Sequence, residues 1–244
     1  MIPPAGIKPG KSNLFYNDSH HAWREELRKF VAKEILPFVE EWEEAGEFSR
    51  ELYKKAGDFG LLGMGYPEEY GGTSEGIDIF HGIVTSEEIA QGCGGVAASL
   101  LSLNISLPLI MALGTEGQKK KYIPPVIAGD KIACLGVTEP SGGSDVAGIK
   151  TKAVRDGDHF IINGSKMFIT SGMRADYYVV ACRTGGPGTS GISAIVVEKG
   201  TLGFTQTRLK KMGWLSSDTA ALYFDDVRVP VENLIGGENS GWMG

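Results

Sequence analysis

A glycine- and hydroxyl-rich stretch, Gly136–Gly148, contains the residues best suited to bind a ligand. It begins inside the strand-like segment 132–138 and reads Gly-Val-Thr-Glu-Pro-Ser-Gly-Gly-Ser-Asp-Val-Ala-Gly. Adjacent glycines let backbone N–H groups approach a phosphate or a ring carbonyl, and Ser and Thr hydroxyls add further donors. The composition predicts an anion or polar-ring site, with an ordinary surface turn as the alternative. It contains neither a P-loop nor a Rossmann fingerprint.

Composition excludes several other kinds of function. The net charge of −6 disfavours a nucleic-acid partner, which more often needs a basic face. Three scattered cysteines and four histidines predict free thiols and no metal site. The apolar stretch 96–113 is interrupted by Ser99, Asn104 and Pro108, so we expect a buried helix and no membrane span. The start of the chain lacks the apolar segment of a signal peptide.

The spacing of apolar residues in the elements that would position this loop changes near residue 130, from a helical pattern to a strand-like one. Apolar spacings of three and four predict helices over 18–35, 49–59, 78–91, 94–113 and 115–123. Short alternating segments over 132–138, 177–182, 192–197, 204–209 and 222–229 predict strands, and Asn163-Gly164 predicts a hairpin turn. The fold class expected is α+β and multidomain, a helical N-terminal domain (1–130) followed by an antiparallel β-barrel or sandwich (131–237).

Residues 238–244 are expected to begin a further helical region. Ser240 could cap a helix, but too few residues follow it to form one. The acidic run 40–44 and the pair Glu87-Glu88 are interpreted as solvated helix faces.

Several separated motifs resemble those of the acyl-CoA dehydrogenase family. The Gly136–Gly148 stretch is similar to the family's first signature, and Gly164–Gly172 is similar to the segment that packs on its flavin ring. The resemblance continues through Tyr66–Gly72, Met212–Trp214, Ser217–Thr219 and Phe224–Pro230, in order along the chain. It implies a helical N-terminal domain, a middle β-domain that binds FAD noncovalently, and a C-terminal helical bundle that is expected to follow Gly244.

By position, the resemblance assigns ligand contacts to two segments. Thr138 would hydrogen-bond the pyrimidine edge of the flavin, and the Thr170 hydroxyl would lie near N5. Donors at the pyrimidine edge stabilise the charge that develops during hydride transfer. Without the resemblance, Thr138 could satisfy a buried backbone group and Thr170 could end a strand. The cofactor contacts implied are Leu135, Val137, Thr138, Gly143, Ser144, Phe168, Ile169 and Thr170, and the substrate contacts are Ser144, Thr189 and Ser190.

The activity implied is desaturation of an acyl-CoA thioester to the trans-2-enoyl-CoA, with electrons passing to an electron-transfer flavoprotein. The family's catalytic base, a glutamate, is expected beyond Gly244, so no catalytic residue is assigned here and Glu139 is interpreted as structural. A homotetramer in the bacterial cytoplasm or an organelle matrix is expected. The alternatives are a truncated, non-catalytic fragment that binds a ligand or partner, and an oxidase or flavin monooxygenase of the same fold.

Overall fold

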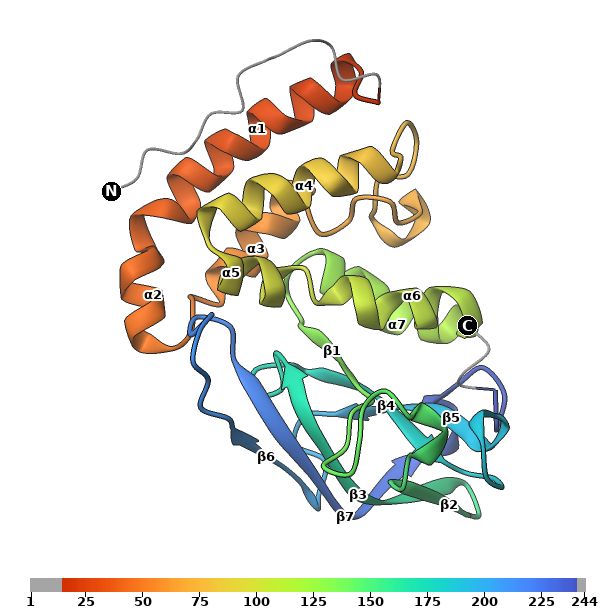
Figure 1. Cartoon of the computed structure of the whole chain (residues 1–244). Helices are drawn as coiled ribbons and strands as arrows, with labels where there is room; N and C mark the ends of the chain where they lie inside the picture. The colour runs from red at the N-terminus through yellow and green to blue at the C-terminus, as the bar shows by residue number, and fades with distance from the viewer. Residues whose placement is uncertain (1–14, 241–244) are drawn as a thin grey trace.

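A layer of helices lies over a mostly antiparallel β-sheet (Figure 1). The computed structural model describes residues 15–240. A helical N-terminal part followed by a β-domain confirms the predicted fold class. The helices are α1 (Asp18–Glu34), α2 (Val39–Ala45), α3 (Glu51–Asp58), α4 (Ile79–Gly92), α5 (Gly94–Leu100), α6 (Leu103–Leu113) and α7 (Glu116–Ile127).

Helices α1 and α4 begin side by side, and their N-terminal caps are interlocked. Asn17 caps α1 and Asp78 caps α4, each in a capping box whose third helical residue is a histidine. The Asn17 N–H donates to His20 Nδ1, and His20 Nε2 lies 2.8 Å from the Asp78 carboxylate. The Asp78 N–H donates to His81 Nδ1. His20, Asp78 and His81 lie close enough together to hold a metal ion, but these capping hydrogen bonds already account for the cluster.

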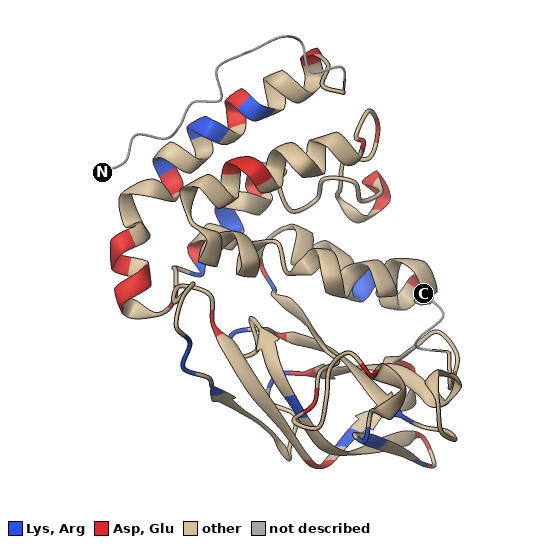
Figure 2. Ribbon diagram, viewed as in Figure 1, with Lys and Arg blue, Asp and Glu red and all other residues tan. Residues whose placement is uncertain are grey.

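Acidic residues gather on α2 (Figure 2). Two glutamates that were expected to be solvated, Glu43 on α2 and Glu88 on α4, instead contact other parts of the protein. Glu43 turns inward and accepts hydrogen bonds from the N–H groups of Leu215 and Ser216. Glu88 on α4 is buried and forms ion pairs with Arg24 and Arg28 on α1, at 2.6 and 3.0 Å. Pairing with these arginines compensates the loss of hydration that a buried carboxylate suffers.

The apolar stretch 94–113 forms two helices instead of the single one expected. By length and hydropathy, Gly94–Leu113 could cross a membrane, but 44% of its most apolar window is buried inside the protein. The backbone breaks between α5 and α6, where Leu101 and Ser102 form a turn. Val96, Leu100 and Leu107 are fully buried in the main hydrophobic core, as expected of core helices.

Within residues 15–240 the sheet has eight strands, and its two edges do not pair with each other. The strand order is β6-β7-β3-β2-β4-β5-β8, and β1 pairs in parallel with β4. Because β6 and β8 lie at opposite ends of this order, the β-domain is not a closed barrel. The strands are β1 (Ala133–Gly136), β2 (Lys152–Asp156), β3 (His159–Thr170), β4 (Tyr177–Arg183), β5 (Ile192–Glu198), β6 (Phe204–Arg208), β7 (Thr219–Pro230) and β8 (Leu234–Ile235).

The hairpin expected at Asn163-Gly164 lies elsewhere. Strand β3 continues through both residues, which form a bulge against β7. The reversal between β2 and β3 occurs at Gly157, whose φ is +61°. Gly164 has φ +143°, and a Cβ there would lie 2.7 Å from the Cα of Thr151. Glycine at this position therefore permits a close backbone approach within a long strand.

Candidate functional site

The glycine-rich loop predicted to bind a ligand follows β1 and is fixed to β3. Glu139 and Gly142 form a tight turn through reciprocal backbone hydrogen bonds of 3.0 and 3.1 Å. One residue earlier, the Thr138 carbonyl accepts the Met167 N–H at 2.8 Å. This bond places the loop beside the second predicted flavin segment, Gly164–Gly172, to which Met167 belongs.

A buried ion pair also fixes this loop to β3. Lys166 is fully buried, and its Nζ donates to Glu139 at 2.9 Å and to the Val137 carbonyl at 3.0 Å. The Glu139 carboxylate also accepts the N–H groups of Lys150 and Thr151, at 2.7 and 2.8 Å. Burial alone would raise the pKa of Glu139, but these hydrogen bonds outweigh it and lower the pKa. Glu139 is therefore occupied in holding the loop.

Phe168 is turned outward by an irregularity in β3. Its φ is +61°, in the left-handed region, and the register with β7 shifts between Lys166 and Ile169. The ring is 68% exposed, whereas Ile169 beside it is buried. Left-handed conformations are uncommon for non-glycine residues and gather at functional sites, where surrounding structure imposes them. The irregularity therefore leaves an aromatic ring exposed one residue after Met167, whose N–H binds the loop.

Three predicted contact residues leave their hydroxyl groups available to a ligand. Within residues 15–240, the hydroxyls of Thr138, Ser144 and Thr170 make no hydrogen bond. Ser144 is exposed, and Thr138 and Thr170 are partly buried. A Cβ at Gly143 would lie 3.2 Å from Thr138 Oγ1, so glycine keeps the space beside that hydroxyl open. Free donors, an open backbone and an exposed aromatic ring fit a flavin and its diphosphate.

The predicted substrate residues belong to a neighbouring turn that Arg183 joins to the glycine-rich loop. Thr189 and Ser190 are exposed in the short helical turn Thr189–Gly191. The Arg183 guanidinium donates to the carbonyls of Ala147 at 2.7 Å and Gly188 at 2.9 Å. One side chain therefore links both segments. Two hollows among the described residues, of about 290 and 200 Å³, lie in the helical part and are lined by none of the predicted contact residues.

Family models match both halves of the chain. The acyl-CoA dehydrogenase N-terminal domain matches residues 17–130, and the acyl-CoA dehydrogenase middle domain matches residues 134–227. The chain belongs to the acyl-CoA dehydrogenase family. The family models describe the same two parts that the fold shows, and the predicted flavin segments lie within the middle-domain match.

Individual members of this family differ in the acyl group that their names specify. The long-chain specific mitochondrial enzyme of Rattus norvegicus is 44% identical over 93% of this chain and 53% of its own length. The short-chain specific enzyme of Clostridium acetobutylicum is 42% identical over 90% of this chain and 58% of its own length. The chain thus spans about half the length of these curated relatives.

A solved structure in the family contains a reduced flavin. A glutaryl-CoA dehydrogenase from Mycobacterium smegmatis in complex with FADH2 is 32% identical, with a TM-score of 0.86, over 96% of this chain and 59% of its own. The contact residues named from the sequence stay predictions, and sequence reasoning missed Lys166 and Arg183, which hold the loop. Neither has a local sequence signal, because their partners lie 27 and 36 residues away.

Proposed function

We propose that this chain forms the flavin-binding part of an FAD-dependent acyl-CoA dehydrogenase, which desaturates an acyl-CoA to the trans-2-enoyl-CoA. One observation carries the proposal. The Thr138–Met167 hydrogen bond brings the two flavin segments together, and both present unpaired hydroxyls. Residues 1–130 and 131–237 would act as the helical and flavin-binding domains.

Each residue of the site has a proposed role. When bound, FAD supplies the ring nitrogen that accepts the substrate's hydride. Thr138 would donate to the pyrimidine edge and stabilise negative charge there, while the Thr170 hydroxyl would orient the ring at N5. Phe168 would stack on the ring, and Leu135, Val137 and Ile169 would exclude water from it. Gly143 and Ser144 would contact the diphosphate.

The acyl-CoA would approach from the side of Ser144, Thr189 and Ser190. Arg183 supports this proposal because it holds the backbone of both segments together. Glu139 does not serve as the base, because its carboxylate binds Lys166 and two backbone amides. We propose that the base lies outside the residues described here, that the electrons pass to an electron-transfer flavoprotein, and that the active enzyme is a tetramer of the bacterial cytoplasm or an organelle matrix.

An anaerobic titration tests the activity. Full-length, FAD-loaded protein would be mixed with saturated acyl-CoAs of increasing chain length and with branched ones, while the visible absorption of the flavin is followed. Bleaching by at least one saturated acyl-CoA supports a dehydrogenase or an oxidase. Rapid peroxide formation in air would then identify an oxidase. Binding of acyl-CoA without bleaching would indicate a ligand-binding protein instead.

A further inference from the structure

Two buried polar atoms near the predicted flavin segment have no direct hydrogen-bond partner. They are Nη1 of Arg174 and Oδ1 of Asp218, and they are the only such side-chain atoms found among the described residues. Asp218 is 1% exposed, and its Oδ1 lies 3.9 Å from Nε of Arg174. That separation is too long for a hydrogen bond. Buried polar groups without partners are rare, so this pair requires an explanation.

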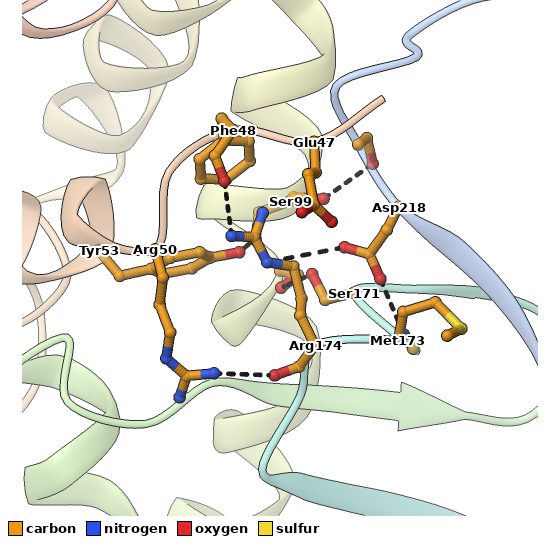
Figure 3. A network of polar contacts seen from close by, with 12 residues as sticks. Glu47, Phe48, Arg50, Tyr53, Ser99, Ser171, Met173, Arg174 and Asp218 are labelled. Carbon is orange, nitrogen blue, oxygen red and sulfur yellow. Dashed lines mark hydrogen bonds and ion pairs between the residues drawn. The ribbon is translucent and has the colours of Figure 1, made fainter. Parts of the chain in front are cut away.

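Arg174 reaches from the β-domain into the helical part (Figure 3). Its Nη2 donates to the Phe48 carbonyl at 2.7 Å. The guanidinium also lies over the rings of Phe48 and Tyr53, 4.5 and 5.4 Å from their centroids. Arg50 donates to the Arg174 carbonyl at 3.1 Å. Arg174 is therefore held firmly by the helical part and has one face directed toward Asp218.

Asp218 holds the turn that follows Thr170. Its Oδ2 accepts the Met173 N–H at 2.8 Å, and its backbone carbonyl accepts the Ser171 N–H at 3.0 Å. Ser171 has φ +60°, so this turn is held in a conformation that a free chain rarely adopts. Burial raises the pKa of Asp218, which shows that direct contacts do not fully compensate its charge.

Two pairs of buried hydroxyls connect this turn, and the residue that precedes Asp218, to the helices. Ser217 Oγ lies 2.8 Å from Ser99 Oγ on α5, and Ser171 Oγ lies 3.2 Å from Ser102 Oγ at the start of α6. The surroundings of Asp218 are thus polar and confined, as a bound water molecule requires.

We propose that one ordered water molecule bridges Arg174 Nη1 and Asp218 Oδ1, and that this bridged pair positions the turn 170–173 against α5 and α6. The water would accept from the guanidinium and donate to the carboxylate, so both atoms gain a partner. A protonated Asp218 would not suffice, because its O–H would itself lack an acceptor and Arg174 Nη1 would stay unpaired. Arg174 and Asp218 are then positioning residues for the segment that ends at Thr170.

A crystal structure of the chain tests the water directly. The expected result is density for one water within about 3.2 Å of both Arg174 Nη1 and Asp218 Oδ1. A direct, hydrogen-bonded Arg174–Asp218 pair, or two atoms that remain apart with no density between them, would overturn the proposal. This test requires no variant and no flavin.

A double-mutant cycle tests the positioning. Arg174→Met and Asp218→Ala are each expected to raise the unfolding equilibrium constant by about 100-fold, because each leaves the other charge buried and unpaired. In the double variant, the rise in the unfolding equilibrium constant should be smaller than the product of the two single rises by at least about tenfold. The matched control is Asp225→Ala, which removes an exposed carboxylate on β7, the strand that follows Asp218, and should change the unfolding equilibrium constant by about twofold or less. Losses that simply multiply would refute the coupling.

Backbone amide hydrogen exchange of the wild-type chain tests the fixed turn even if the single variants do not fold. In the wild-type chain, the Ser171 and Met173 N–H groups should exchange as slowly as those of the strand core. Exchange as fast as in exposed loops would contradict a fixed turn.

The consequence for the cofactor rests on the proposed function and has a separate readout. Under conditions in which the variants are folded, Asp218→Ala should weaken FAD binding by roughly tenfold, since a misplaced Thr170 loses one hydrogen bond. Asp225→Ala should leave the affinity unchanged. Equal affinity in both variants would refute this role of Asp218. If the wild-type chain does not bind FAD, the proposed function fails, while the crystal structure and the cycle still decide the bridged pair.

Discussion

Replacing Lys166 by methionine should destabilise the protein strongly. Lys166 is fully buried, and Met fills a similar volume without the charge. Removing one member of a buried ion pair costs about 3–5 kcal/mol, because the remaining charge stays buried. Glu139 would keep its hydrogen bonds from Lys150 and Thr151, so we expect a loss near 3 kcal/mol.

Urea unfolding of Lys166→Met at neutral pH measures this loss. The matched control is Lys150→Met, because the Lys150 side chain is exposed and only its backbone N–H contacts Glu139. We expect the control to change stability by about 0.5 kcal/mol or less. A loss below about 1 kcal/mol for Lys166→Met would refute the assignment of a buried, paired lysine.

The same variant should change the response to acid. Hydrogen bonds, including that from Lys166, lower the pKa of Glu139 below 4.5 in the folded protein despite its burial. Its contribution to stability is therefore present above pH 4.5 and is lost as the pH falls through the lowered pKa. Without Lys166 the folded-state pKa should rise, so this loss should occur at higher pH in Lys166→Met.

Three further predictions concern other positions. Gly164→Ala should cost about 2 kcal/mol or more in urea unfolding, because its φ is +143° and a Cβ would contact Thr151; an unchanged midpoint would contradict this. Phe168→Ala should change stability by only about 0.5 kcal/mol, because the ring is exposed, yet weaken FAD binding roughly tenfold; equal affinities would remove its stacking role. Glu43→Gln should make stability less sensitive to acid below pH 4.5, because hydrogen bonds from Ser216 and Leu215 lower the pKa of Glu43 despite its burial; an unaltered pH profile would contradict this.

Local sequence patterns predicted most helices and strands, because their determinants are short-range. Asp78 and Thr115 were expected to lie at helix starts, and both are N-caps with side-chain hydrogen bonds. The pattern failed where long-range contacts override local preference. Asn163-Gly164 favours a tight turn, but pairing of β3 with β7 continues across it as a bulge. Pro124 and Pro125, expected to follow a helix, lie inside the last turns of α7.

The same distinction between local and long-range determinants applies to the candidate site. The contact residues were predicted from contiguous motifs, which a sequence displays directly. The residues that fix these motifs were missed, because Arg183 on β4 and Lys166 on β3 bind a loop that is distant from them in the sequence. Glu88 and Glu43 resembled solvated residues, since nothing local reveals that Arg24 or the Ser216 backbone will lie against them. Such pairings depend on how segments that are distant in the sequence pack, within one part of the chain for Glu88 and between the two parts for Glu43.

An FAD titration of the purified chain tests the central claim most directly. Flavin absorption would be followed for the wild type and for a variant carrying both Thr138→Val and Thr170→Val, substitutions that keep the shape and remove two unpaired hydroxyls. We predict saturable binding at one site, weakened by at least about tenfold in the variant. Identical titration curves, or no saturable change with the wild type, would show that these two segments do not form a flavin site.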